Sequence, residues 1–276
     1  MKLIGLSDVR LERVPVEEWN FKNANVTIAS TVFTASSFGG VAPTPVGGLT
    51  GEVIYVHGGS APEFAAAGNV TGKIVLIDFE SPMWWMSYPS MEAGVRGAKA
   101  ILLTHSDTPD FYGYYDQPNA LGCFDAETEI TAPPMVHISW HDGDTLKTLF
   151  KGGSITATVH NNVSIRLVKA GGMGYNVVGT LPGSAKNGQM VLYGSHHDAW
   201  FQGSLDNISA VVNSLVAAKA MKMSGYHPER TIVFFSSTAE EYCYVNSYYD
   251  WCIGAWYCIT HTNPDIRATS GGEARG

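Results

Sequence analysis

Apolar runs alternate with polar, glycine-rich stretches along this chain, and in its second half their spacing predicts a layered α/β structure. Apolar runs predict strands over residues 175–181, 189–194 and 230–236. Between the last two, residues 207–223 carry apolar side chains near the helical period, which predicts one long helix packed on a sheet. Strands separated by a helix in this way are typical of a doubly wound α/β fold.

The first half predicts a different architecture, rich in short strands. Helices are expected only after Pro89 and over residues 142–150. The predicted strands cover residues 26–34, 51–56, 73–79, 101–105, 135–139 and 154–169. A Gly-Gly-Met-Gly break at residues 171–174 marks a boundary. We therefore expect a compact β-rich module over residues 45–165, followed by an α/β domain.

The composition is that of a chain that can fold, and its net charge argues against one class of binding partner. Of the 276 residues, 45% are hydrophobic and 15% are charged, which is typical of a globular protein. The formal net charge of -8 argues against nucleic acid as a partner, because phosphates are bound by clustered Lys and Arg. No stretch is long and apolar enough for a membrane segment, and the start of the chain is too short and too soon charged for a signal peptide. The sequence does not fix the localisation, although an extracellular or cell-envelope parent protein is plausible.

Two histidines and two aspartates crowd into the stretch that follows the strand at residues 189–194. They are His196, His197, Asp198 and Asp206. Imidazole and carboxylate groups at a strand end are costly to desolvate unless a cation lies between them. The sequence therefore predicts a metal site here.

A pair of carboxylates, Glu240 and Glu241, follows the next predicted strand. Ligands of α/β sheets bind beyond the carboxyl ends of the strands, so both clusters are expected in one place. Their ligand types suit zinc, and Asp206 is placed to bridge two zinc ions, while one glutamate binds metal and the other takes a proton. Alone, a Glu-Glu pair is more often a favourable charge at a helix N-terminus, and a single His is more often structural. The combination favours the metal site.

Three segments carry a recognisable pattern. The segments Gly194-Ser-His-His-Asp-Ala-Trp200, Gly203-Ser-Leu-Asp-Asn207 and Arg230-Thr-Ile-Val-Phe-Phe-Ser-Ser-Thr-Ala-Glu-Glu-Tyr242 closely resemble the co-catalytic zinc exopeptidases of the glutamate carboxypeptidase, aminopeptidase and transferrin receptor-like family. Residues 45–165, with Gly72-Lys-Ile-Val-Leu-Ile-Asp78, resemble the protease-associated (PA) domain inserted in that family's peptidase domain. The resemblance thus implies an incomplete doubly wound zinc-exopeptidase sheet, formed by residues 1–44 and 166–276, with a PA domain inserted over residues 45–165.

The resemblance also implies a role for each residue of the site. His196 would bind one zinc ion, Asp206 would bridge two, and Glu241 would bind the second. Glu240 would be the general base for hydrolysis of a peptide substrate, and Asp198 would hold the His196 ring in position. The implied activity is that of a metallo-exopeptidase, with an aminopeptidase favoured over a carboxypeptidase.

Two further implications concern the same stretch. His197 matches no ligand position of the family, so a structural role is expected for it. The family has a non-proline cis peptide after the bridging aspartate, which makes Asp206-Asn207 the expected cis bond.

In the PA domain, Trp84 and Trp85 would help to cover the substrate cleft, although burial between domains is an equal alternative.

The sequence departs from the family pattern near its end. The family has two more ligands, an Asp after the next strand and a later His, but after Glu241 the candidates are Asp250, His261 and Asp265, without a suitable strand. We therefore expect a piece truncated at both ends that is inactive by itself. A non-catalytic binding protein of the transferrin receptor type is the alternative, and the complete protein could form a homodimer.

Overall fold

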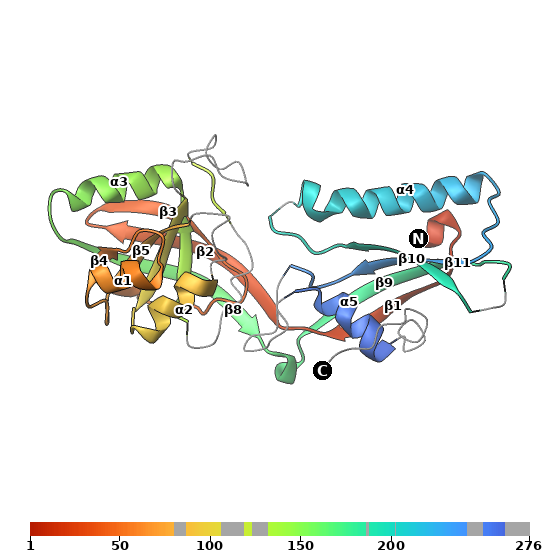
Figure 1. The fold of residues 1–276 in the computed structure, drawn as a ribbon, viewed down its shortest axis with the longest axis horizontal. Helices are drawn as coiled ribbons and strands as arrows, with labels where there is room; N and C mark the ends of the chain where they lie inside the picture. The colour runs from red at the N-terminus through yellow and green to blue at the C-terminus, as the bar shows by residue number, and fades with distance from the viewer. Residues whose placement is uncertain are drawn as a thin grey trace. The chain divides into compact units, whose positions relative to one another are not determined.

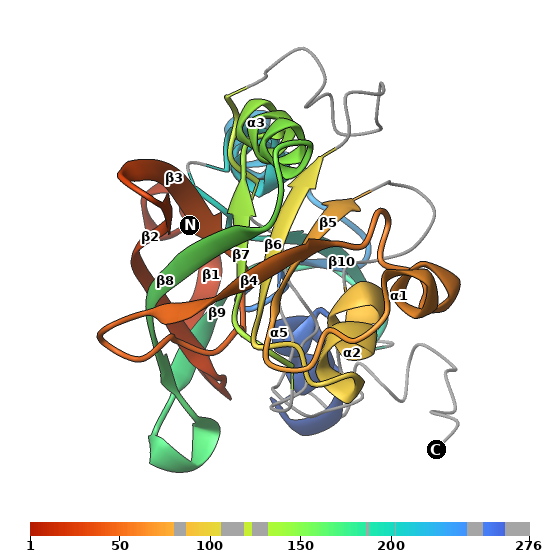
Figure 2. The ribbon, with the colours of Figure 1, turned by 90° about the vertical axis from the view of Figure 1, so that its left-hand side faces the viewer.

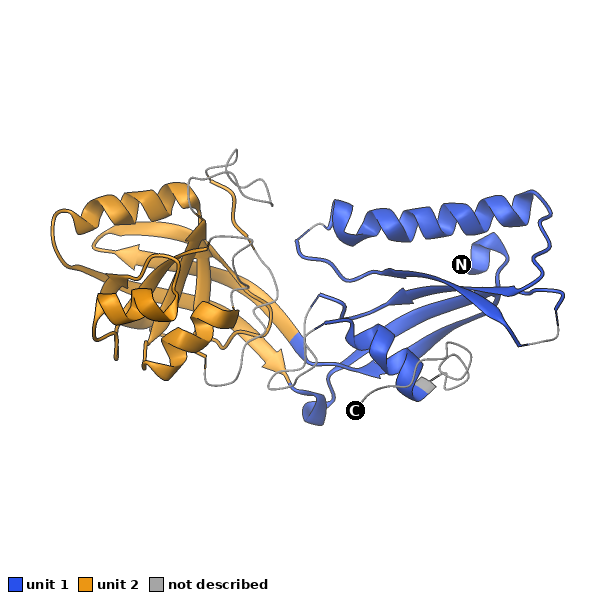
Figure 3. Ribbon diagram, in the orientation of Figure 1, with its two compact units in different colours: residues 1–18, 167–244, 248–276 blue, residues 19–166, 245–247 orange. Residues whose placement is uncertain are grey.

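A computed structural model describes residues 1–79, 87–105, 119–122, 132–185, 188–201, 203–241 and 251–262. The chain divides into two compact units, which are coloured separately in Figure 3. Among the described residues, unit 1 holds residues 1–18 and those from 167 onward, and unit 2 holds residues 19–166.

Unit 1 is built on a four-stranded sheet in the order β1-β9-β11-β10 (Figure 1). The strands are β1 (Ser7–Pro15), β9 (Met173–Leu181), β10 (Met190–His196) and β11 (Thr231–Ser237). β10 and β11 are parallel and are joined by helix α4 (Ala210–Met223), while β9 is antiparallel to both β1 and β11. Parallel neighbours need such a crossover connection, which explains why a helix separates these two strands in the sequence.

Apolar residues alternate along β11 and bury both faces of the sheet. Ile232 and Phe234 pack in a cluster with Ala218 of α4, whereas Phe235 packs with Cys258 on the other face. Helix α5 (Ile253–Tyr257) and the wider turn η5 (Cys258–Thr262) lie on that second face (Figure 1). The predicted α/β sheet with helices on both faces is therefore confirmed. This unit also contains the 3₁₀ turns η1 (Lys2–Ile4) and η3 (Val168–Ala170) and the π-helical segment η4 (Ser204–Ser209).

Unit 2 is a closed barrel in the order β2-β3-β7-β6-β5-β4-β8 (Figure 2). Its strands are β2 (Glu18–Ile28), β3 (Thr31–Ser37), β4 (Leu49–Tyr55), β5 (Ile74–Phe79), β6 (Ala100–His105), β7 (Met135–Ile138) and β8 (Ile155–Arg166). Its helices are α1 (Ala61–Ala67), α2 (Ser87–Val95) and α3 (Trp140–Phe150). Every residue of β5 and β6 is buried, because alternate side chains enter two separate apolar clusters.

The predicted domain boundary at residue 45 lies inside unit 2. Residues 19–44 belong with the barrel because β2 and β3 pair with each other and β3 pairs with β7. That pairing joins residues far apart in the sequence, so no local pattern announces it. The PA identity of this module stays a prediction. In the described part of the chain, no helix is both long and apolar enough to cross a membrane.

Candidate metal centre

The candidate site lies where β10 and β11 end side by side. Their parallel register pairs His196 with Ser237, so the segments that follow both strands leave the sheet at the same edge. His196 and Asp198 come from the first segment, and Glu240 and Glu241 come from the second. The structure thus brings together side chains that are distant in the sequence, at the edge where α/β folds bind ligands.

His196 is buried, with 8% of its surface exposed, and its ring is held from both sides. Nδ1 lies 3.1 Å from the carbonyl oxygen of Asp198, which only accepts hydrogen bonds, so Nδ1 is the protonated nitrogen. Nε2 lies 3.0 Å from Oδ1 of Asp206 and 3.6 Å from Oε2 of Glu240. In this tautomer Nε2 has its lone pair directed at the carboxylates, as a metal ligand requires.

Asp198 makes contacts beyond the orienting role implied by the sequence. Its Oδ1 lies 3.5 Å from Nδ1 of His196, but its Oδ2 accepts hydrogen bonds from the backbone N–H of Glu240, at 2.8 Å, and of Glu241, at 3.0 Å. One carboxylate therefore fixes the backbone of both glutamates. Such backbone contacts leave no signal in the residue pattern, which is why the sequence does not reveal them.

Glu240 and Glu241 complete a group of potential ligands with His196. One ligand atom from each of the three lies within 4.8 Å of the others. Burial first, and then the negative charges of Asp206 and Glu240, together raise the pKa of Glu241 to about 7, against a smaller opposing effect of His196. Crowded carboxylates with one raised pKa are electrostatically unfavourable alone, and a bound cation would relieve the repulsion.

Asp206 extends this group toward solvent. It lies in η4, its side chain is 74% exposed, and its peptide bond to Asn207 is cis, as the resemblance predicts. Gly203 begins the turn at a φ of 51°, where a Cβ atom would meet Cβ of Ala199 at 2.0 Å. The chain therefore needs glycine at this turn in order to bring Asp206 next to His196.

The geometry fits a zinc site. For zinc with bonds of about 2.0 to 2.2 Å in a tetrahedral arrangement, ligand atoms lie about 3.4 Å apart. The separation of His196 Nε2 from Oδ1 of Asp206, at 3.0 Å, is close to that value. The donor set of one imidazole and several carboxylates is also one that zinc accepts.

Two other residues singled out by the sequence, His197 and His261, lie outside this group. His197 contacts Oγ of Ser236 through Nδ1 at 3.2 Å, and burial lowers its pKa. His261 lies in η5, with Nδ1 2.6 Å from Oγ1 of Thr260. The remaining predictions, for Asp250, Asp265, Trp84 and Trp85, fall outside the described residues.

Cys252 is a neighbour of the site that the sequence does not identify. Its Sγ donates to Oε1 of Glu240 at 3.3 Å, and its backbone N–H donates to the carbonyl of Glu240 at 3.1 Å. Cys252 directly precedes α5, and the start of α5 is hydrogen-bonded to the segment that follows β11. Aromatic residues surround this cysteine in the sequence, so its contact with the site follows only from the fold.

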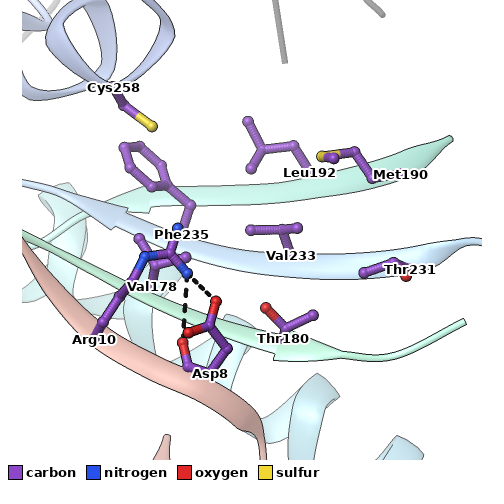
Figure 4. Close-up of a pocket in the computed structure, with 10 residues that line it drawn as sticks. All are labelled: Asp8, Arg10, Val178, Thr180, Met190, Leu192, Thr231, Val233, Phe235 and Cys258. Carbon is purple, nitrogen blue, oxygen red and sulfur yellow. Dashed lines mark hydrogen bonds and ion pairs between the residues drawn. The ribbon is translucent and has the colours of Figure 1, made fainter. Parts of the chain in front are cut away.

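A separate pocket lies on the α5 face of the sheet in unit 1 (Figure 4). Its volume is about 230 Å³, and its floor is formed by apolar residues of β9, β10 and β11, including Val178, Leu192 and Val233. Arg10 and Asp8 at its margin pair with each other, and Arg10 also pairs with Glu12. None of the predicted site residues lines this pocket, so it is distinct from the metal centre.

Comparisons with known proteins show that the chain is similar to peptidases. The sequence model of the family described as Peptidase family M28 matches residues 176–271. The chain is 30% identical to aminopeptidase NAALADL1 of Mus musculus over 166 residues, which are 58% of this chain and 19% of that protein. It is 24% identical to carboxypeptidase Q of Mus musculus over 248 residues, which are 86% of this chain and 51% of that protein.

Two solved structures share the fold. A peptidase M28 precursor from Shewanella amazonensis matches with a TM-score of 0.73 and 23% identity, over 96% of this chain and 60% of that one. BSAP, a zinc aminopeptidase from Bacillus subtilis, matches with a TM-score of 0.64 and 21% identity, over 87% of this chain and 53% of that one. The chain therefore spans about half to three fifths of the length of these two proteins.

Proposed function

We propose that this chain is part of a zinc-dependent metallo-exopeptidase that acts on peptides, because the sequence model of Peptidase family M28 matches its residues 176–271. The observation that carries the proposal is the meeting of His196, Glu240 and Glu241 at the ends of β10 and β11, with Asp206 beside His196. The family match supports the reaction class, and the cluster supports the choice of residues for it.

In the proposed site, His196 and Glu241 would each hold one of two zinc ions, and Asp206 would contribute its carboxylate to both. Zinc, when bound, supplies a Lewis acid that polarises the substrate carbonyl and makes water more acidic. The short contact between His196 and Asp206, at 3.0 Å, supports their placement on a shared ion. Asp198 keeps the glutamate segment in place through its two backbone hydrogen bonds.

Glu240 is the proposed general base. It takes a proton from the attacking water and delivers it to the nitrogen of the leaving amine. Its carboxylate is partly exposed and accepts a hydrogen bond from Sγ of Cys252, so one oxygen is oriented while the other faces His196. A partly exposed carboxylate can exchange its proton between reaction cycles.

We propose an aminopeptidase rather than a carboxypeptidase. The relative NAALADL1 and the fold neighbour BSAP are both named as aminopeptidases. The name of carboxypeptidase Q points the other way, so the substrate end is the feature to test.

The test uses the full-length protein that contains this sequence. We expect it to hydrolyse a peptide with an unblocked N-terminus, to lose activity with a chelator, and to regain it with Zn²⁺. N-terminal acetylation should abolish hydrolysis, whereas C-terminal amidation should not. Hydrolysis that persists without metal would contradict the mechanism.

The variant Glu240→Gln separates the two candidate functions. It should lower kcat by about 10² to 10⁴ with little change in zinc content. The matched control is Glu229→Gln, because Glu229 is exposed and lies outside the site. A wild-type protein that binds zinc and hydrolyses none of these peptides would favour the non-catalytic binding protein.

A further inference from the structure

We infer that Asn176 is a positioning residue that fixes the backbone of the Glu240–Glu241 segment, an inference that rests on the proposed zinc site. Asn176 lies in β9 and is fully buried. Its Nδ2 donates to the carbonyl of Gly254 at 2.8 Å, and its Oδ1 accepts from the N–H of Thr238 at 3.1 Å. One amide thus joins the segment before the two glutamates to the start of α5.

The amide completes a set of backbone hydrogen bonds between these segments. The carbonyl groups of Thr238, Ala239 and Glu240 accept from the N–H groups of Gly254, Ile253 and Cys252, at 3.1, 2.9 and 3.1 Å. On the other side, the N–H groups of Glu240 and Glu241 donate to Asp198. The glutamate segment is therefore held through its carbonyl groups by the start of α5 and through its N–H groups by Asp198.

The packing around Asn176 leaves no room for adjustment. A Cβ atom on Gly254 would lie 2.2 Å from the carbonyl oxygen of Thr238 and 2.5 Å from Oδ1 of Asn176. A Cβ atom on Gly174, two residues before Asn176, would lie 2.6 Å from Oγ1 of Thr238. These two glycines permit a close approach, so the position of residue 238 is set by contact as well as by hydrogen bonding.

Asn176 can act on the metal centre only through this backbone. Both its polar atoms bond to backbone groups, Thr238 and Gly254, and Thr238 lies two residues before Glu240. Metal affinity depends on ligand position, and partners that orient ligands typically account for about 10- to 100-fold in affinity. Loss of the amide should therefore weaken zinc binding although Asn176 is not a ligand.

The experiment compares Asn176→Leu with Asn161→Leu in the same chain. Asn161 is a matched control because it is a buried asparagine of unit 2 whose Nδ2 donates to the carbonyl of Ala42 at 3.1 Å. We expect Asn176→Leu to weaken Zn²⁺ binding about tenfold or more in a chelator competition and to change the visible spectrum of the Co²⁺ form. Asn161→Leu should lower the melting temperature and leave both properties unchanged.

A second variant covers the case in which Asn176→Leu does not fold. Gly254→Ala disturbs the same contact from α5 and should produce the same spectral change. If both variants fold, their double mutant should bind Zn²⁺ no more weakly than the poorer single variant, because both act through one segment. Wild-type affinity and spectrum in Asn176→Leu, or in Gly254→Ala if only that variant folds, would overturn the inference.

Hydrogen exchange in the metal-free chain distinguishes this inference from the proposed function. The amides of Glu240 and Glu241 should exchange about tenfold faster in Asn176→Leu, or in Gly254→Ala, than in the wild type or in Asn161→Leu. If the wild type binds no zinc but this acceleration occurs, the zinc proposal fails and the positioning role stands. Unchanged exchange at both amides would overturn the positioning role.

Discussion

The barrel of unit 2 and the sheet of unit 1 solve the problem of burying strands in different ways. In the barrel each strand has a neighbour on both sides, and β5 and β6 are buried along their whole length. In unit 1, β10 has one described neighbour, and Val191, Leu192 and Tyr193 are exposed along it. His196 of the candidate site is the last residue of β10, and the carboxylates of the site lie beyond the ends of β10 and β11.

The two units therefore differ in role: the barrel is stabilised by apolar packing, whereas the sheet carries the residues of the candidate site. Apolar packing stabilises the barrel without any ligand, because two clusters fill both sides of its central strands. The sheet ends in His196 and crowded carboxylates, one with a pKa raised to about 7, so binding of the proposed cation would add to its stability. Substitutions in the two units should therefore have effects of different kinds.

The largest effect on folding is expected from Leu102→Ala in the barrel. Leu102 is fully buried in the cluster that includes Leu76 and Val136, so the cavity should lower the free energy of unfolding by about 3 kcal/mol. Urea unfolding measures this change, with the exposed Val32 as the site of a control substitution to alanine. Zinc affinity should not change, and a parallel loss of affinity would contradict the separation.

The converse substitution, His196→Ala, should act on metal binding. Removing a ligand should weaken Zn²⁺ binding at least about 100-fold, or about 2.7 kcal/mol. Calorimetric titration tests this, and the exposed His227 provides the control variant His227→Ala. Wild-type affinity in His196→Ala would remove this histidine from the site.

A smaller effect is expected at the start of α1 in the barrel. Oγ of Ser60 accepts from the N–H of Glu63 at 3.4 Å, and Oε2 of Glu63 accepts from the N–H of Ser60 at 2.9 Å. Ser60→Ala should lower the free energy of unfolding by about 1 kcal/mol because it removes this capping box. Thermal melting compares it with Ser164→Ala on the exposed side of β8. An equal shift in both variants would show that the cap contributes nothing.

A pH dependence is expected from Glu241. Its pKa in the folded chain, about 7, lies above the ordinary value of 4.5, so the folded state retains a proton that the unfolded state releases. The free energy of unfolding of the metal-free chain should therefore fall as pH rises from about 4.5 to 7. Glu241→Gln should remove this part of the slope, as melting temperatures at several pH values with a chelator would show. An identical slope in Glu241→Gln and the wild type would contradict the raised pKa.

Much of unit 1 is predictable from the sequence because its strands and helix are continuous apolar runs. The predicted helix at residues 207–223 begins at Ala210, since residues 204–209 form η4 with non-helical angles at Asp206 and Asn207. The site histidine and carboxylates are likewise visible as residue types. Their positions relative to one another are not, because they depend on the register of β10 with β11.

Other features escape a reading of the sequence for a physical reason. The boundary expected at residue 45 is misplaced because β3 pairs with β7, a strand that comes much later in the sequence. The backbone contacts of Asp198 and Asn176 are invisible because an acceptor for an N–H group can come from many residue types. Cys252 contacts Glu240 only because the fold places the start of α5 beside the segment that follows β11.

The pairing of β1 with β9 makes the barrel a removable module. Their antiparallel register runs from Ser7 and Thr180 to Pro15 and Met173, and Val16 still bonds to Gly172 at 3.3 Å. The chain thus leaves unit 1 and re-enters it at two adjacent points, the geometry of a hairpin whose loop has been replaced by a whole domain. A short turn in place of residues 17–171 would close that hairpin, so this junction is a natural place to transplant or delete the barrel by protein engineering.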